Sequence, residues 1–294
     1  MSLIYSLERI FYRKNKSIPQ FREYDKRRGF TAWSDECRAV AARPKNALED
    51  NPLGQQGFTR VRVFSEEEAA EIKQRFDRQD TKLRDSKNSE NSQMLDSWNL
   101  SGLKEVIGRA ITPEVDRILY AYFGSEYAPY WYSMQRALPN HEARRPFLWH
   151  CDKGPSMFAK MLLYFTAVAD TGGNTHVLDR QTTLAFDRAG YNFGSGKNRL
   201  EDLTGFAEQH GIKFTPMSYD LRPGEAVLIL PQMVLHRGVM PSKAPRFIMQ
   251  VTFVPSKIHW REALFKEDRK NMEELAKDYT WPKHASQFRP LLSN

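Results

Sequence analysis

Apolar residues recur along this chain at two spacings, which predict a strand-to-helix opening followed by a β-rich half. The segment "GFTRVRVF" predicts a strand that ends near Phe64. In "SEEEAAEIKQRF", Ser65 and Glu68 have the spacing of a capping box, so we expect a helix to begin there. A second helix is expected to start at Thr112 and to end at a glycine, because Pro113 suits a first helical turn.

Beyond the second helix the pattern is mainly that of strands. The expected strands are "APYWYSMQRAL", the apolar part of "FLWHCDKGPSMFAKMLLYFTAVADTGG", "NTHVLDRQTTLAF", "IKFTPMSYDL", "EAVLILP" and "RFIMQVTFVPS". The polar residues 79–98 predict a loop, residues near 199–210 a short helix, and residues 261–278 a charged helix. One β-rich domain flanked by helices fits this pattern.

Residues 1–56 differ from the rest and are interpreted as a basic N-terminal extension. Helical spacing is shared by five of the apolar residues at its start, Leu3, Ile4, Leu7, Ile10 and Phe11. Such a helix either packs against its own domain or contacts an anionic membrane surface through residues 1–16. The main domain is therefore expected to be residues 57–294, including a C-terminal helix.

Composition and charge narrow the class of protein. The 294 residues, 40% of them hydrophobic, are enough for a substantial core. The net charge of +8 suits an anionic partner, although a solvated basic surface explains it equally well. Two cysteines cannot build a disulfide framework, and no uncharged apolar stretch approaches the roughly 18 residues of a membrane span. We therefore expect a cytoplasmic protein without a transmembrane segment, and the pattern indicates nothing about its oligomeric state.

The candidate chemistry begins at "WHCD". His150 and Asp152 are two residues apart, so on an extended segment their side chains project to the same face, while Cys151 projects away and is expected to pack. A histidine and a carboxylate supply two ligands for a divalent metal. A second histidine from elsewhere would complete the two-histidine, one-carboxylate triad of non-haem Fe(II) oxygenases.

A candidate for the second histidine stands in "LRPGEAVLILPQMVLHRGVMPSKAPRFIMQ". A Pro-Gly turn leads into an apolar strand, and His236 follows the end of that strand. Arg246 begins the next β-rich segment, and its guanidinium fork would match a carboxylate of a dicarboxylate cosubstrate. The alternative is a structural histidine with a surface arginine. His259 and Arg269 have the same spacing but lack this strand context.

Taken together, "WHCD", "VADTGGNTHVL", the "RPGEAVLI…LHRG" block and the arginine after it resemble the phytanoyl-CoA dioxygenase-like family of Fe(II)/2-oxoglutarate oxygenases. The opening "GFTRVRVFSEEEAAEIKQRF" is also similar, and the likeness spans residues 57–256. The resemblance implies a mainly β fold with flanking α-helices, in which the core is a double-stranded β-helix (jelly roll, cupin-like). The segment "VLDRQTT" departs from the "LPGSH"-like segment that borders the substrate site in relatives, so a familiar substrate is not implied.

The resemblance also implies Fe(II), 2-oxoglutarate and O₂ as cofactors. The three iron ligands implied are His150, Asp152 and His236. Arg246 would bind the distal carboxylate of 2-oxoglutarate, and Tyr132 and Gln135 occupy the places of further cosubstrate contacts. The implied reaction hydroxylates an unactivated C–H of a small molecule, or desaturates or cyclises it, with release of succinate and CO₂. A small residue at position 152 would instead have suggested a halogenase.

Two residues beside the "WHCD" motif are candidates for contacts with the substrate. Trp149 would line an aromatic substrate site or belong to the core, and Arg145 would hold an anionic group of the substrate or lie in a solvated loop. One alternative function is a nucleic-acid demethylase of the same superfamily, which usually carries a further arginine that is missing here, so no nucleic acid is expected. The other is a non-catalytic basic jelly-roll binding module. A cupin motif with two histidines is excluded because no H-x-H occurs.

Overall fold

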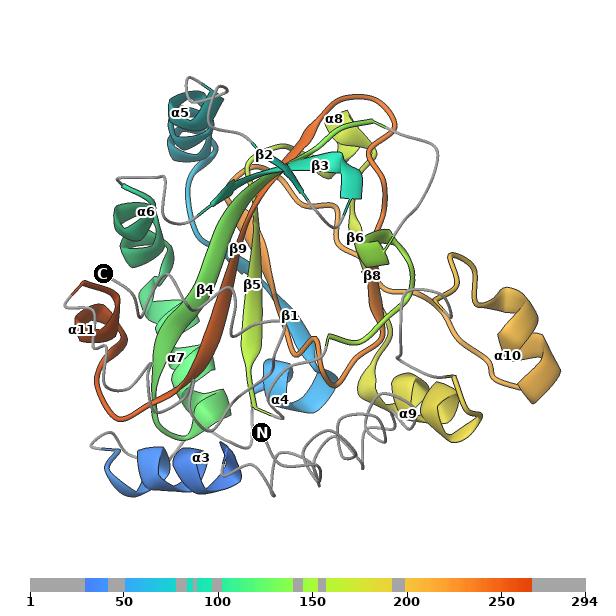
Figure 1. The fold of residues 1–294 in the computed structure, drawn as a ribbon, viewed down its shortest axis with the longest axis horizontal. Helices are drawn as coiled ribbons and strands as arrows, with labels where there is room; N and C mark the ends of the chain where they lie inside the picture. The colour runs from blue at the N-terminus through green and yellow to red at the C-terminus, as the bar shows by residue number, and fades with distance from the viewer. Residues whose placement is uncertain are drawn as a thin grey trace, which may run out of the picture.

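The computed structural model describes residues 30–41, 51–77, 84–86, 89–96, 102–139, 145–152, 157–191 and 199–265. Two antiparallel sheets form its centre (Figure 1). The strands of the larger sheet, in spatial order, are β1 (Phe58–Arg62), β7 (Glu225–Ile229), β5 (Ala159–Tyr164), β9 (Arg246–Ser256), β4 (Glu126–Ala137), β3 (Ser89–Asp96) and β2 (Arg84–Ser86). The smaller sheet pairs β6 (Thr175–Val177) with β8 (His236–Gly238).

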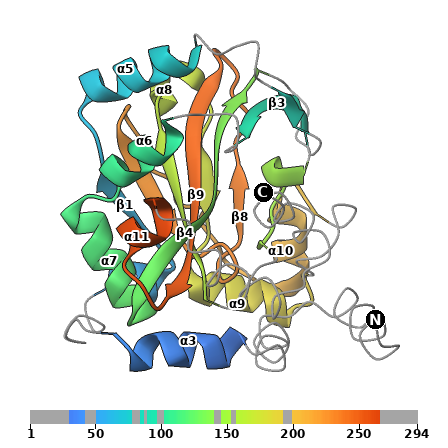
Figure 2. The same ribbon diagram turned by 60° about the vertical axis from the view of Figure 1, so that its left-hand side comes forward.

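Helices cover one face of the larger sheet, and the smaller sheet lies on the other side (Figures 1 and 2). The covering helices are α5 (Glu66–Asp77), α6 (Leu103–Ala110), α7 (Pro113–Phe123) and α11 (Trp260–Phe265). The remaining helices are α3 (Phe30–Ala39), α4 (Pro52–Gln56), α8 (Val168–Thr171), α9 (Arg180–Arg188), α10 (Thr204–His210) and the 3₁₀ turn η3 (Arg145–Phe147). The chain is therefore a mixed fold of helices and antiparallel sheet.

Alternation along each strand divides the larger sheet into two apolar faces. On β5, Met161 and Leu163 pack with the covering helices in the largest core cluster. Leu162 and Tyr164, one residue out of step, pack instead with Val177 of β6. The second face of β5, β7 and β9 therefore looks onto the smaller sheet. Two isolated bridges, one at His150 and one at Met217, flank β6 and β8.

The local start and stop signals for helices are confirmed. The capping box before α5 is formed in both directions, because the Ser65 amide donates to Glu68 Oε2 (3.0 Å) and the Glu68 amide donates to Ser65 Oγ (3.1 Å). At α7 the Thr112 hydroxyl accepts from the Val115 amide at 3.3 Å. Gly124 ends that helix at φ 65°, a left-handed conformation that glycine adopts without strain.

Three predictions about secondary structure are corrected. The polar segment 79–98 contains the hairpin β2–β3, which pairs with β4, and not only a loop. The segment "NTHVLDRQTTLAF" is a strand only over β6, because Asp179 caps α9 by accepting from the Thr182 amide at 2.7 Å. The segment "IKFTPMSYDL" contributes a single bridge, at Met217, where a strand was expected.

Parts of the N-terminal and C-terminal predictions fall outside the described residues, among them the amphipathic segment 1–16 and residues 266–278. Within residues 1–56, the indole nitrogen of Trp33 in α3 donates to the carbonyl of Pro255 at 3.1 Å. Trp33 and Cys37 form a small apolar cluster with Phe158 and Val254. In the described ranges, α11 is the C-terminal helix, and no helix there has the length and apolar character needed to cross a bilayer.

Candidate metal centre

The backbone brings the two predicted histidines together. The His150 amide donates to the His236 carbonyl at 3.0 Å and the His236 amide donates to the His150 carbonyl at 2.9 Å, which makes a narrow antiparallel bridge. The Asp152 amide donates to the carbonyl of Pro231 at 2.7 Å. Since the two histidines face each other across one bridge, their rings lie on the same side, with centroids 4.4 Å apart.

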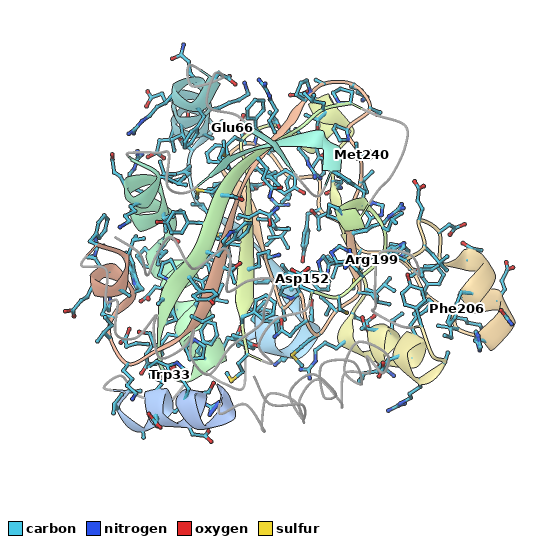
Figure 3. All side chains as sticks on the ribbon, in the orientation of Figure 1. Trp33, Glu66, Asp152, Arg199, Phe206 and Met240 are labelled. Atoms are coloured by element: carbon cyan, nitrogen blue, oxygen red, sulfur yellow. The ribbon has the colours of Figure 1, made fainter. Side chains whose placement is uncertain are left out.

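Asp152 completes a compact set of ligand atoms. The candidate ligand atoms of His150, Asp152 and His236 all lie within 4.8 Å of one another. Asp152 Oδ1 is 3.4 Å from His150 Nε2 and 3.9 Å from His236 Nε2. Figure 3 shows Asp152 in the interior, between the larger sheet and β8. The structure therefore brings the three predicted ligands into one cluster.

Hydrogen bonds fix which ring nitrogen of each histidine faces the carboxylate. His150 Nδ1 lies 2.6 Å from the carbonyl of Leu148, and His236 Nδ1 lies 3.0 Å from the carbonyl of Val234. A carbonyl oxygen can only accept, so each Nδ1 carries the proton and donates. Each Nε2 then presents its lone pair toward Asp152, which is the arrangement that metal-binding histidines use.

Burial and the neighbouring charge of Lys160 together determine which of the three side chains is charged. Burial, and then the nearby charge of His150, lower the pKa of His236 to about 3. Burial also lowers the pKa of His150. Burial by itself would raise the pKa of Asp152, but the positive charge of Lys160 beside it holds the pKa well below its usual value. At neutral pH the cluster is therefore two neutral imidazoles and one carboxylate.

Arg246 is a buried cation on the same interior face. Its side chain is 5% exposed, and it follows the alternation of β9 that places Ile248 toward the smaller sheet. Nη1 donates to the carbonyls of Asn174 (2.5 Å) and Val239 (3.4 Å), while Nε is buried without a hydrogen-bond partner. Among the described residues no carboxylate lies within ion-pair distance of this guanidinium.

Two glycines lie beside the Arg246 side chain, and Gly173 makes room for it. A Cβ built on Gly173 would lie 3.1 Å from Arg246 Cδ, which is tighter than an ordinary contact, whereas one built on Gly238 would lie in ordinary contact with Arg246 Nη2, at 3.5 Å. Gly238 is on the same strand as His236 and two residues further on, so the guanidinium lies beside the strand that carries a candidate ligand. The ring of Phe147 lies 5.8 Å from the guanidinium carbon, measured to the ring centroid.

The structure separates the remaining predicted site residues. Gln135 pairs with Ile248 across β4 and β9, so it lies on the interior face, and its Oε1 accepts from Gln250 Nε2 at 2.7 Å. Tyr132 is out of step with Gln135 and packs on the largest core cluster, on the opposite face. Tyr132 is therefore on the other side of the sheet from the three predicted ligands, and its contact with a cosubstrate stays a prediction.

Trp149 and Arg145 flank the triad in sequence. Trp149 is 2% exposed and packs with Cys151 in a separate apolar cluster, because the alternation that projects His150 inward turns both of its neighbours away. Trp149 therefore lies in the core, and its contact with a substrate stays a prediction. The backbone of Arg145 begins η3, and its side chain is outside the described residues.

The contact of Lys160 with Asp152 was not predicted from the sequence. Its Nζ donates to Asp152 Oδ2, and its side chain is only 16% exposed. The signal was present as a single lysine within the longest apolar run, at the same parity as the interior residues Leu162 and Tyr164. An isolated charge on the buried face of a strand indicates a partner of opposite charge.

No family model matches the chain, and no curated protein matches it. Among solved structures, the chain is similar to the non-heme alpha ketoglutarate dependent epimerase SnoN from nogalamycin biosynthesis (TM-score 0.47, 13% identity, 76% of this chain and 83% of that one). It is also similar to HygX from Streptomyces hygroscopicus with nickel and 2-oxoglutarate bound (0.45, 14%, 70% and 86%). A third is EctD from S. alaskensis (0.48, 14%, 72% and 79%). At these scores and identities the matches assign neither a family nor an activity to this chain.

Proposed function

We propose that the chain is a non-haem Fe(II)- and 2-oxoglutarate-dependent oxygenase built on a double-stranded β-helix. The fold supports this in one respect: the interior face of the larger sheet looks onto β6 and β8, and the bridges at His150 and Met217 extend that smaller sheet on both sides. Two facing antiparallel sheets of this kind are the layers of a jelly roll.

The donor set fits iron. Two imidazole nitrogens and one carboxylate oxygen on one side of a metal leave the other coordination positions open, as non-haem Fe(II) oxygenases require. The Nδ1 donors to Leu148 and Val234 hold the rings of His150 and His236 in place. In our proposal these two histidines and Asp152 are the metal ligands.

The observation that carries the proposal is the buried guanidinium of Arg246 on the same interior face as the triad. A cation that is 5% exposed, with a buried Nε lacking a hydrogen-bond partner, is costly unless an anion binds to it. A guanidinium recognises a carboxylate by two parallel hydrogen bonds. We assign Arg246 to the distal carboxylate of 2-oxoglutarate and Gln135, on the same face, to a further polar contact with it.

When bound, iron with 2-oxoglutarate and O₂ supplies the oxidation of an unactivated C–H of a small molecule, with succinate and CO₂ as the other products. The side chains of this chain bind and orient the reactants, and the apolar walls of the interior exclude water from them. Hydroxylation is the simplest outcome of this chemistry, and desaturation or cyclisation are its relatives. Lys160 adds a positive charge beside the triad, which favours a substrate with an anionic group.

The test is anaerobic reconstitution of the full chain with Fe(II), followed by addition of 2-oxoglutarate and a search for the weak visible charge-transfer band of their complex. We expect the band in the wild type and its loss in Asp152→Ala and Arg246→Ala. Arg237→Ala is the matched control, because this arginine lies over the ring of Trp149 on the outward face of β8, 5.5 Å from the ring centroid. Folded protein without iron or band would leave the non-catalytic binding module as the better reading.

A further inference from the structure

Lys160 contacts the candidate metal site from β5. Register pairs it with Ile229 of β7 on one side and with Thr252 of β9 on the other, so it stands in the middle of the larger sheet. Its side chain is 16% exposed and its Nζ donates to Asp152 Oδ2. A lysine in this position is largely removed from water, and the carboxylate of Asp152 is its ion-pair partner.

The two oxygens of Asp152 have different neighbours. Oδ1 faces the two histidines, 3.4 Å from His150 Nε2 and 3.9 Å from His236 Nε2. Oδ2 accepts from Lys160. An ammonium has only donors and cannot itself bind a metal, so a lone pair of Oδ2 that accepts from Lys160 is not free for a metal.

We propose that Lys160 is a positioning residue that restricts Asp152 to coordination through one oxygen. This inference rests on the proposed function, because it concerns the same metal site. A carboxylate with both oxygens free can bind a metal through both and fill a second coordination position. With Oδ2 held by Lys160, that position stays available to the cosubstrate or to O₂.

The charge of Lys160 acts on the two bound species in opposite directions. It lies beside the site of a divalent cation and therefore weakens metal binding by repulsion. Fe(II), Asp152, Arg246 and a 2-oxoglutarate dianion cancel in charge, so Lys160 leaves the loaded site positive and strengthens binding of the dianion. Replacing Lys160 by methionine, which fills a similar space without charge, should therefore tighten metal binding and weaken 2-oxoglutarate binding.

The experiment uses the metal-free full chain and two readouts besides turnover. Mn(II) affinity is measured from the electron paramagnetic resonance signal of free Mn(II), and 2-oxoglutarate affinity by calorimetry on the Mn(II)-loaded protein. For Lys160→Met we expect Mn(II) to bind at least about tenfold more tightly and 2-oxoglutarate at least about tenfold more weakly. Lys160→Arg keeps charge and donors and should stay near the wild type in both.

The matched control is Lys73→Met, which removes the lysine of another Lys–Asp pair, Lys73 Nζ to Asp77 Oδ2 at 2.6 Å on α5. It should change neither affinity. A merely structural lysine would move both affinities in the same direction or leave both unchanged in Lys160→Met, and either result overturns the inference while the proposed function stands. A folded wild type that binds neither Mn(II) nor 2-oxoglutarate overturns the proposed function, and this inference with it.

Discussion

Gly238 offers a sharp test of the interior around Arg246, because a single methyl group would displace the Phe147 ring, which lies beside the guanidinium. A Cβ at this position would lie 2.8 Å from Cδ1 of the Phe147 ring and 3.5 Å from Arg246 Nη2. Gly238 is not among the glycines with positive φ, so alanine fits its backbone. Gly238→Ala therefore tests the available space and not backbone strain.

The expected cost follows from these contacts. Carbon atoms pack at about 3.5–4.0 Å, so the Phe147 ring must move by about 0.7 Å or more, and it is 4% exposed with no solvent to move into. Overpacking of this kind costs about 1–3 kcal/mol, which lowers Tm by about 2–4 °C for each kcal/mol in a chain of this size. Since the ring lies under the Arg246 guanidinium, its movement should also weaken 2-oxoglutarate binding about tenfold.

The assay is urea unfolding of the wild type and Gly238→Ala, with calorimetry of 2-oxoglutarate binding on the metal-loaded proteins. The matched control is Gly205→Ala, in exposed α10, where a built Cβ meets nothing within 4 Å. This control should be as stable as the wild type, or more stable by up to about 1 kcal/mol from helix propensity. If Gly238→Ala matched the wild type in both stability and 2-oxoglutarate affinity, the crowding around Arg246 inferred here would be wrong.

Three further predictions follow from other contacts. Arg246→Leu would remove the proposed charge-assisted hydrogen bonds to a cosubstrate carboxylate, worth about 3 kcal/mol, so 2-oxoglutarate affinity should fall about 100-fold in calorimetry while Mn(II) affinity stays the same. Arg237→Leu is the control for a general loss of the fold, and it should keep both affinities. Glu225→Gln removes the charge of a buried carboxylate that accepts from two arginines of β1, each at 2.8 Å. Urea unfolding should show a free energy of unfolding lower by about 2 kcal/mol, and not by more, because water screens the half-exposed arginines. A change below about 0.5 kcal/mol would contradict this. Thr112→Ala removes the N-cap hydrogen bond of α7 and should lower the free energy of unfolding by about 1 kcal/mol in the same assay. Thr112→Ser keeps a hydroxyl at this position and should lose much less.

Local signals in the sequence were sufficient for the helices at the start of the domain. The capping box at Ser65 and the Thr112–Pro113 start of α7 act within one turn of helix, so neighbours in sequence decide them. Alternation likewise placed His150 and Asp152 on one side of an extended segment, and the structure keeps them there. These predictions needed no knowledge of tertiary contacts.

Tertiary pairing decided the features that the sequence did not predict. The hairpin β2–β3 has a polar sequence, and its strands are defined by pairing with β4, which supplies partners to its backbone groups. The side of β4 that faces the interior was also undetermined, so Gln135 and Tyr132 could not be separated until the register with β9 was known. The partner of Lys160 required the same knowledge, because β5 and the segment of Asp152 meet only in the folded sheet.

The bridge between His150 and His236 has a consequence for the order of folding and metal loading. The two histidines lie far apart in the chain, so their segments pair only after the strands between them have found their places, and such non-local pairing is slow. A metal at this site therefore cannot nucleate the domain in the way that zinc nucleates a small finger. We expect the newly made chain to complete its fold first, with Lys160 neutralising the carboxylate of Asp152 in the meantime, and to acquire its metal as a later maturation step.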